Sequence, residues 1–125
     1  MTDFIAAADR LVAAYNVKDF SAFRKLIAPD LDFEHFNRNF AFKRLDGLME
    51  SIEQFDNHYL PDRHFEPPVR VTVSGNVVIR EAYYTGTAKV DIPGFGPKGG
   101  TVRLKFCTVF RFDDRGILVE WKDYG

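Results

Sequence analysis

The chain has 125 residues and a formal net charge of −1, so Lys and Arg nearly balance Asp and Glu. This length fits one domain, residues 1–125, and the balanced charge gives no basic field for nucleic acid or an anionic membrane. The single cysteine, Cys107, excludes an internal disulfide, and no apolar run approaches the roughly 20 residues of a membrane-spanning helix. Because the N-terminus also lacks the pattern of a secretory signal, we expect a cytoplasmic protein.

Three helices are expected in the first half of the chain. Thr2 can cap a helix over 3–16, in which apolar residues recur at helical spacing. Asp19 can cap a short second helix that Pro29 closes. A third helix is expected over 45–59, again with one apolar face.

A short strand is expected between the second and third helices. Over 31–37 the residues alternate, with Leu31, Phe33, His35 and Asn37 on one side. This places two polar side chains, those of His35 and Asn37, at one end of an otherwise apolar strand face.

The second half of the chain changes to a period of two. Four strands are expected, joined by turns at 74–76 and 113–116 and by a Gly- and Pro-rich loop at 91–100: residues 69–74, 77–90, 101–113 and 117–124. Helices followed by a hairpin meander predict an α+β fold, with three N-terminal helices packed on a curved, mostly antiparallel sheet.

The predicted sheet has a clear inner face. In the strand over 101–113 one face carries only Thr and apolar residues: Val102, Leu104, Phe106, Thr108, Phe110 and Phe112. A long strand must curl to cover short helices, and curling produces a cone-shaped barrel with one open end. A cone lined by some of the 13 Phe residues predicts an apolar pocket.

The last strand places a carboxylate on its apolar face. Alternation puts Ile117, Val119, Trp121 and Asp123 on one side. In a closed core an isolated charge costs several kcal/mol or is neutralised. At the wall of a ligand cavity the same surroundings raise the pKa of Asp123 and make the group a usable proton carrier.

The order of these elements, ending in Trp121-x-Asp123-Tyr124, resembles the SnoaL-like branch of the nuclear transport factor two-like superfamily. Ketosteroid isomerases and limonene epoxide hydrolases belong to the same superfamily. Several local strings share the resemblance: Asn16-Val17-Lys18-Asp19, Ala28-Pro29-Asp30, Leu60-Pro61-Asp62, Gly86-Thr87, Gly94-Phe95-Gly96-Pro97-Lys98-Gly99 and Phe112-Asp113-Asp114-Arg115-Gly116. The resemblance covers nearly the whole chain.

The resemblance implies different chemistry for each branch. Ketosteroid isomerases carry a general-base Asp where this chain has His35. Epoxide hydrolases use an Asp-Arg-Asp triad, for which Asp123 and Arg80 match but Ala82 stands at the other Asp. SnoaL-like polyketide cyclases keep one Asp on the final strand as a general acid and base, which Asp123 matches most closely.

The leading hypothesis is therefore a cofactor-independent enzyme of SnoaL-like type, a cyclase or isomerase that acts on a small apolar molecule with a carbonyl group. Asp123 and His35 are the expected catalytic residues, and Trp121 is expected to donate its indole N–H to a ligand oxygen. Further substrate contacts are expected from several aromatic and polar side chains: Phe33, Asn37, Arg80, Tyr15 and Phe106. Which of Tyr15, Tyr59, Tyr83 and Tyr84 supplies a hydroxyl stays open.

Arg80 separates the first alternative from the leading hypothesis. If Arg80 points inward at Asp123, it lowers the pKa of the carboxyl group and favours an epoxide hydrolase. The second alternative is a non-catalytic binding or dimerisation module, in which Phe side chains fill the cone and Asp123 points outward.

No metal or other cofactor is expected. The three His lack paired i,i+4 spacing, and Cys107 has no partner at ligand spacing. The resemblance further implies a homodimer formed through the outer face of the sheet.

Overall fold

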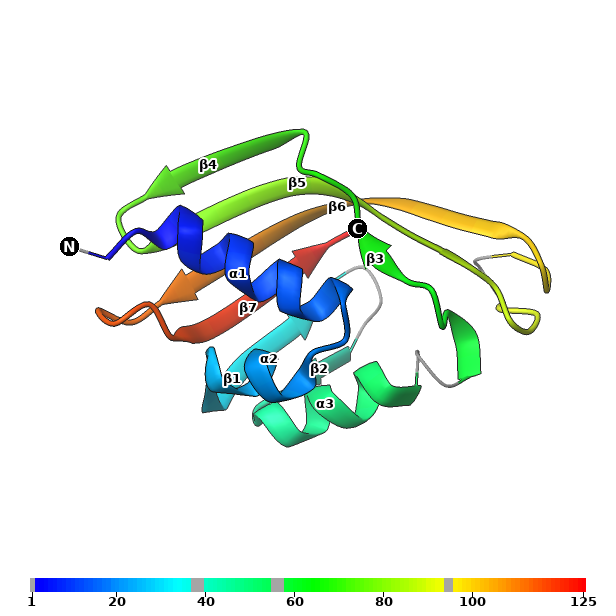
Figure 1. Ribbon diagram of the computed structural model, residues 1–125, viewed down its shortest axis with the longest axis horizontal. Helices are drawn as coiled ribbons and strands as arrows, with labels where there is room; N and C mark the ends of the chain where they lie inside the picture. Colours follow the sequence, from blue (N-terminus) through cyan, green and yellow to red (C-terminus); the bar gives the residue numbers. More distant parts are fainter. Residues whose placement is uncertain (1, 37–39, 55–57, 94–95) are drawn as a thin grey trace.

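The computed structural model describes residues 2–36, 40–54, 58–93 and 96–125, and it places three helices against one side of a curved sheet (Figure 1). Helix α1 covers Phe4–Asn16, α2 covers Phe20–Lys25, and α3 covers Leu45–Gln54. The predicted α+β class is confirmed. The third helix was predicted to reach Tyr59, but residues 55–57 lie outside the described part of the chain.

Aspartates cap the first two helices. Asp19 accepts a hydrogen bond from the Ala22 N–H at 3.1 Å, as predicted for α2. For α1 the predicted cap was wrong by one residue, because Asp3 accepts from the Ala6 N–H at 3.0 Å. The Thr2 hydroxyl instead donates to the Asp114 carbonyl at 2.7 Å and ties the start of the chain to the β6–β7 turn.

Seven strands form one sheet, in the order β2-β1-β7-β6-β5-β3, with β4 also paired to β5. Their bounds are β1 Ile27–His35, β2 Phe40–Phe42, β3 His64–Phe65, β4 Arg70–Ser74, β5 Val77–Thr87, β6 Thr101–Phe112 and β7 Leu118–Tyr124. The predicted meander corresponds to β4 through β7. The short strands β2 and β3 were not predicted.

One pair of strands, β1 and β7, runs parallel, whereas the other pairs are antiparallel. This pairing joins the first strand of the chain to the last and was not part of the predicted meander. Its register places His35 opposite Asp123. A parallel partner so distant in sequence leaves no turn signal between the two strands, so no local pattern could have indicated it.

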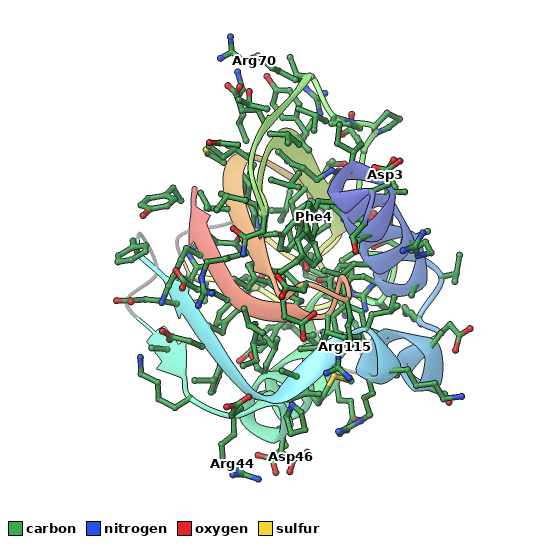
Figure 2. The ribbon with its side chains drawn as sticks, turned by 90° about the vertical axis from the view of Figure 1, so that its left-hand side faces the viewer. Asp3, Phe4, Arg44, Asp46, Arg70 and Arg115 are labelled. Carbon is green, nitrogen blue, oxygen red and sulfur yellow. The ribbon has the colours of Figure 1, made fainter. Side chains whose placement is uncertain are left out.

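The inner face of β6 is as predicted. Phe106, Thr108, Phe110 and Phe112 are buried, and Phe4 of α1 stacks on Phe112 with ring centroids 5.9 Å apart. Figure 2 shows the sheet curling around the side chains that it encloses, with Arg44, Asp46 and Arg70 on the outside.

The predicted inner face of β7 was wrong at its start. Leu118 is buried whereas Val119 is half-buried, because the register between β6 and β7 shifts next to Phe112. Such an irregularity inserts one residue into a strand, so alternation slips by one on one side of it. Trp121 and Asp123 lie beyond the shift, and both point inward.

Among the described residues, none of the helices combines the length and the apolar character needed to cross a membrane.

Candidate active site

Asp123 is a buried acid near the end of β7, with 3 % of its surface exposed. Its Oδ1 accepts two hydrogen bonds, from the Thr108 hydroxyl at 2.6 Å and from the Trp121 indole N–H at 3.0 Å. Loss of hydration on burial raises the pKa of Asp123 to about 6, although both hydrogen bonds act in the opposite direction. The group can therefore gain and lose a proton near neutral pH.

Strand geometry explains why these three side chains meet. Trp121 and Asp123 are two residues apart on β7 and so share a face. Thr108 is the cross-strand partner of Asp123 on β6. Thr108 was predicted to face inward but not to contact Asp123, because the register shift between β6 and β7 prevents a simple count of residues from the turn.

The Trp121 side chain has a different role from the one expected. Its indole N–H donates to Asp123 and is therefore committed to the acid rather than to a ligand oxygen. The ring itself packs edge-on against Phe33 and Phe110, with centroids 5.3 Å away in each case. Trp121 is a wall of the cavity that also orients the carboxyl group.

His35 lies beside Asp123 on the neighbouring strand β1. It is buried, and its ring meets the Phe106 ring edge to face, with centroids 5.1 Å apart and an interplanar angle of 87°. The parallel register of β1 and β7 makes His35 the direct partner of Asp123. The two ionisable side chains of Asp123 and His35 therefore share one end of the sheet.

A cavity of about 300 Å³ opens next to this pair. Six of the eight predicted site residues line it: Asp123, His35, Trp121, Phe33, Tyr15 and Phe106. The remaining wall includes Tyr84, one of the four candidate tyrosines, and Leu104 of the predicted inner face. Five further lining residues were not predicted for the site: Leu48, Ser51 and Ile52 of α3, Leu60 and Phe65. The lining is mostly apolar, so polar groups of a ligand would find few partners away from Asp123 and His35.

Of the two remaining predicted site residues, Arg80 lies in the described part of the chain but does not line the cavity. Arg80 is buried but points to α1, where its Nη2 lies 3.7 Å from Oδ1 of Asp9. It makes no hydrogen bond or ion pair with Asp123, because Thr108 lies between them on the sheet as the partner of both. Asn37 lies outside the described residues.

The structure distinguishes among the four candidate tyrosines. Tyr15 and Tyr84 both line the cavity, and their hydroxyl oxygens are 3.0 Å apart. Tyr83 lies on the opposite face of β5, where the Arg103 guanidinium covers its ring at 3.7 Å. Tyr59 packs half-buried against the core.

Arg63 is a buried residue that was not predicted to belong to the site. Its guanidinium donates to the Tyr15 carbonyl at 2.8 Å and lies 3.9 Å from the centre of the Tyr15 ring. The isolated position of Arg63 in a polar segment gave no signal of burial. Its contacts fix Tyr15 against the cavity.

Within the described ranges, the His, Cys, Asp and Glu side chains form no group of three that could hold a metal ion.

The profile of the SnoaL-like domain matches residues 8–121. The chain belongs to the SnoaL-like family. No curated protein matches the sequence significantly. Its membership therefore rests on this profile and on the fold.

Solved structures of the same fold match nearly the whole chain. A candidate polyketide cyclase from Xanthomonas campestris is 18% identical, with 98% of this chain and 89% of that chain covered and a TM-score of 0.83. For IdmH from Streptomyces antibioticus, another candidate polyketide cyclase, the identity is 20%, the coverage 98% and 91%, and the TM-score 0.81. An LEH-like epoxide hydrolase from M. tuberculosis is 20% identical over 97% and 80%, with a TM-score of 0.73. Similarity at these identities establishes the fold only. The chemistry of this SnoaL-like chain has to be inferred from the residues of its own site.

Proposed function

We propose that this SnoaL-like protein is a cofactor-independent enzyme that moves a proton next to a carbonyl group in a small, largely apolar ligand. One observation carries the proposal: a buried carboxyl group with a pKa of about 6 lies in the wall of an apolar cavity, beside a buried histidine. In a closed core a buried carboxyl group would only lower the stability of the fold when it ionises. A general acid and base, in contrast, needs a pKa near the working pH.

The hydrogen bonds to Asp123 favour one of its two oxygens as the proton carrier. Both donors bind Oδ1, so Oδ2 is the oxygen that can take a proton. With a pKa of about 6, most of the Asp123 side chains are ionised at pH 7. The carboxylate takes the proton from the carbon next to the carbonyl, and the electrons of that C–H bond move into the carbonyl as an enolate forms.

His35 is the group proposed to stabilise the enolate oxygen. It lines the same cavity and is the strand partner of Asp123. A hydrogen bond from its imidazole becomes stronger as negative charge develops on the oxygen. Return of the proton from Asp123 to another carbon gives an isomerisation, and attack of the enolate carbon on a second carbonyl gives an aldol-type cyclisation.

The proposal is tested by deuterium exchange at carbon 2 of 1-tetralone, a small apolar ketone, followed by proton NMR in heavy water. The wild-type protein should accelerate the exchange, and Asp123→Asn should reduce the acceleration at least about a hundredfold, as expected when a general base is removed. Asp114→Asn, which changes an exposed acid, is the matched control and should retain it. Binding of 1-tetralone without exchange in the wild type would favour the non-catalytic alternative.

Epoxide hydrolysis is the second candidate. It is supported by the fold shared with the LEH-like enzyme and by Asp123, which the sequence resemblance places in the triad of limonene epoxide hydrolases. It lacks the expected Arg80–Asp123 contact, since the ionic partner of Arg80 is Asp9. Conversion of limonene epoxide to a diol by the wild type but not by Asp123→Asn, without exchange on 1-tetralone, would replace the first proposal with this one.

A further inference from the structure

We propose that the paired hydroxyls of Tyr15 and Tyr84 form a second polar subsite, which binds an oxygen at the end of the ligand remote from Asp123. This inference rests on the proposed function for the carbonyl end of the ligand. It defines the substrate class more closely: a mainly apolar carbonyl compound with a second hydroxyl or carbonyl oxygen on the far side of its ring system.

The two polar groups lie at different ends of the cavity. Tyr84 is the cross-strand partner of Leu104 on β6, and Asp123 is the partner of Thr108 on the same strand. These β6 positions are four residues apart, which corresponds to about 13 Å of strand. Because Tyr84 and Asp123 both line the cavity, a ligand that reaches both must be elongated.

The region between the two ends is apolar. The Phe106 ring lies between the two β6 positions, stacks on the Tyr84 ring at 5.3 Å and meets the His35 ring edge to face at 5.1 Å. One aromatic ring thus separates the tyrosine pair from the acid and histidine. The cavity has a polar end, an apolar middle and a second polar end, which is the distribution of polarity expected of its ligand.

The tyrosine pair can hydrogen-bond to a ligand in either direction. A phenol hydroxyl can both donate and accept hydrogen bonds, and the two hydroxyl oxygens lie 3.0 Å apart in the wall of the cavity. Either hydroxyl can be the donor within the pair. The pair can therefore donate to a carbonyl oxygen or accept from a hydroxyl group.

Both rings are held rigidly, which favours a binding role. Arg63 fixes Tyr15 through its backbone carbonyl and its ring face. The Phe65 and Phe106 rings both pack on Tyr84, with centroids 5.0 and 5.3 Å away. Polar groups that are already oriented lose little conformational entropy when a ligand binds.

The test compares two ketones that differ by one distal oxygen, 1-tetralone and 6-hydroxy-1-tetralone. Binding is followed through the NMR signal of the Trp121 indole N–H, which is unambiguous because the chain has one Trp and its ring lines the cavity. In the wild type the hydroxylated ketone should bind roughly two- to tenfold more tightly, the usual contribution of one neutral hydrogen bond.

A double variant decides the assignment. Tyr15→Phe with Tyr84→Phe should bind both ketones equally, whereas Tyr83→Phe, a matched change on the outer face of β5, should keep the wild-type preference. A dispersed amide spectrum of each variant verifies that it is folded. Equal binding of the two ketones by the wild type, or a preference that survives in the double variant, would overturn the subsite.

The Asp123→Asn variant separates binding at the tyrosine pair from the proton-transfer reaction. Asp123→Asn should lose the exchange reaction and still prefer the hydroxylated ketone. If the wild type catalyses no exchange but loses its preference only in the double variant, the subsite stands and the proton-transfer proposal falls.

Discussion

At the scale of single residues, the charge of Asp123 is set by two opposed effects. Burial favours the protonated form, whereas the hydrogen bonds from Thr108 and Trp121 favour the ionised form. Burial is the larger effect, so the pKa stands at about 6 rather than near 4. The side chains around Asp123 should therefore control the pH at which the site works.

Removal of the Thr108 hydroxyl should move that pH upward. In Thr108→Val one hydrogen bond to the ionised form is lost, so the pKa of Asp123 should rise by about one pH unit or more. The acid limb of the pH profile for 1-tetralone exchange should shift by the same amount. Thr108→Ser keeps the hydroxyl and is the control; identical profiles for the Val and Ser variants would show that the contact has no such effect.

The raised pKa also has a consequence for stability. In the native state the carboxyl group keeps its proton up to about pH 6, whereas the unfolded chain releases it near 3.8. The stabilisation that the group provides is therefore complete below about pH 4 and is lost as the pH rises through 6.

Asp123→Asn should remove this dependence. Relative to the wild type, the variant should gain on the order of 2 kcal/mol between pH 4 and pH 7.5, because no buried charge then forms. Thermal unfolding of both proteins at the two pH values measures the change. A difference in stability that does not vary with pH would contradict a raised pKa.

Alternation along the strands predicted which residues point into the site. It did not predict which of these residues contact one another. Phe33 and His35 on β1 and Trp121 and Asp123 on β7 were all placed inward from a period of two. The direction of Arg80 and the partner of Asp123 depended on the register between strands, which a single sequence does not contain. The same limit explains why Tyr84 was one of four open candidates.

At the scale of elements, the helices and the long strands followed from local signals. Gly75 and Gly116, with φ of 58° and 82°, occupy the left-handed region in the two predicted turns. The short strands β2 and β3 have three and two residues, too few for a periodic pattern. The parallel pairing of β1 with β7 and the register shift beside Phe112 arise from tertiary contacts, so the sequence pattern could not reveal them.

The N-cap of α2 supports the back of the site. Phe23 of this helix is fully buried and contacts the rings of Tyr15 and Trp121, with centroids 5.9 and 6.2 Å away. Asp19→Ala removes the side chain that satisfies the Ala22 N–H and should lower the free energy of unfolding by about 1 kcal/mol in urea. Asp19→Asn keeps a side-chain oxygen at this position and should retain most of the free energy of unfolding. Equal losses in both variants would argue against a capping role.

At the scale of the whole molecule, the two faces of the curved sheet have different surroundings. The inner face and the helices enclose the cavity, and the outer face carries half-buried residues such as Ile79 and Val109, which are cross-strand partners on β5 and β6. In line with the homodimer expected from the sequence resemblance, we propose that a second copy of the chain covers this outer face.

Sedimentation equilibrium tests the dimer. The wild type should have twice the mass of one 14.4 kDa chain, and Ile79→Lys should shift the population to single chains because it places a charge in the interface. A wild type that sediments as a single chain at all concentrations would contradict the proposal. The cavity would be unaffected, since Ile79 is not among its lining residues.

The most direct test of the whole account is an NMR titration of the Asp123 carboxyl carbon, with its signal assigned by comparison with Asp123→Asn. We expect a midpoint near pH 6, which 1-tetralone should shift when it occupies the cavity. A midpoint near 4, the ordinary value of a hydrated aspartate, would contradict the dry environment from which the proposed chemistry follows.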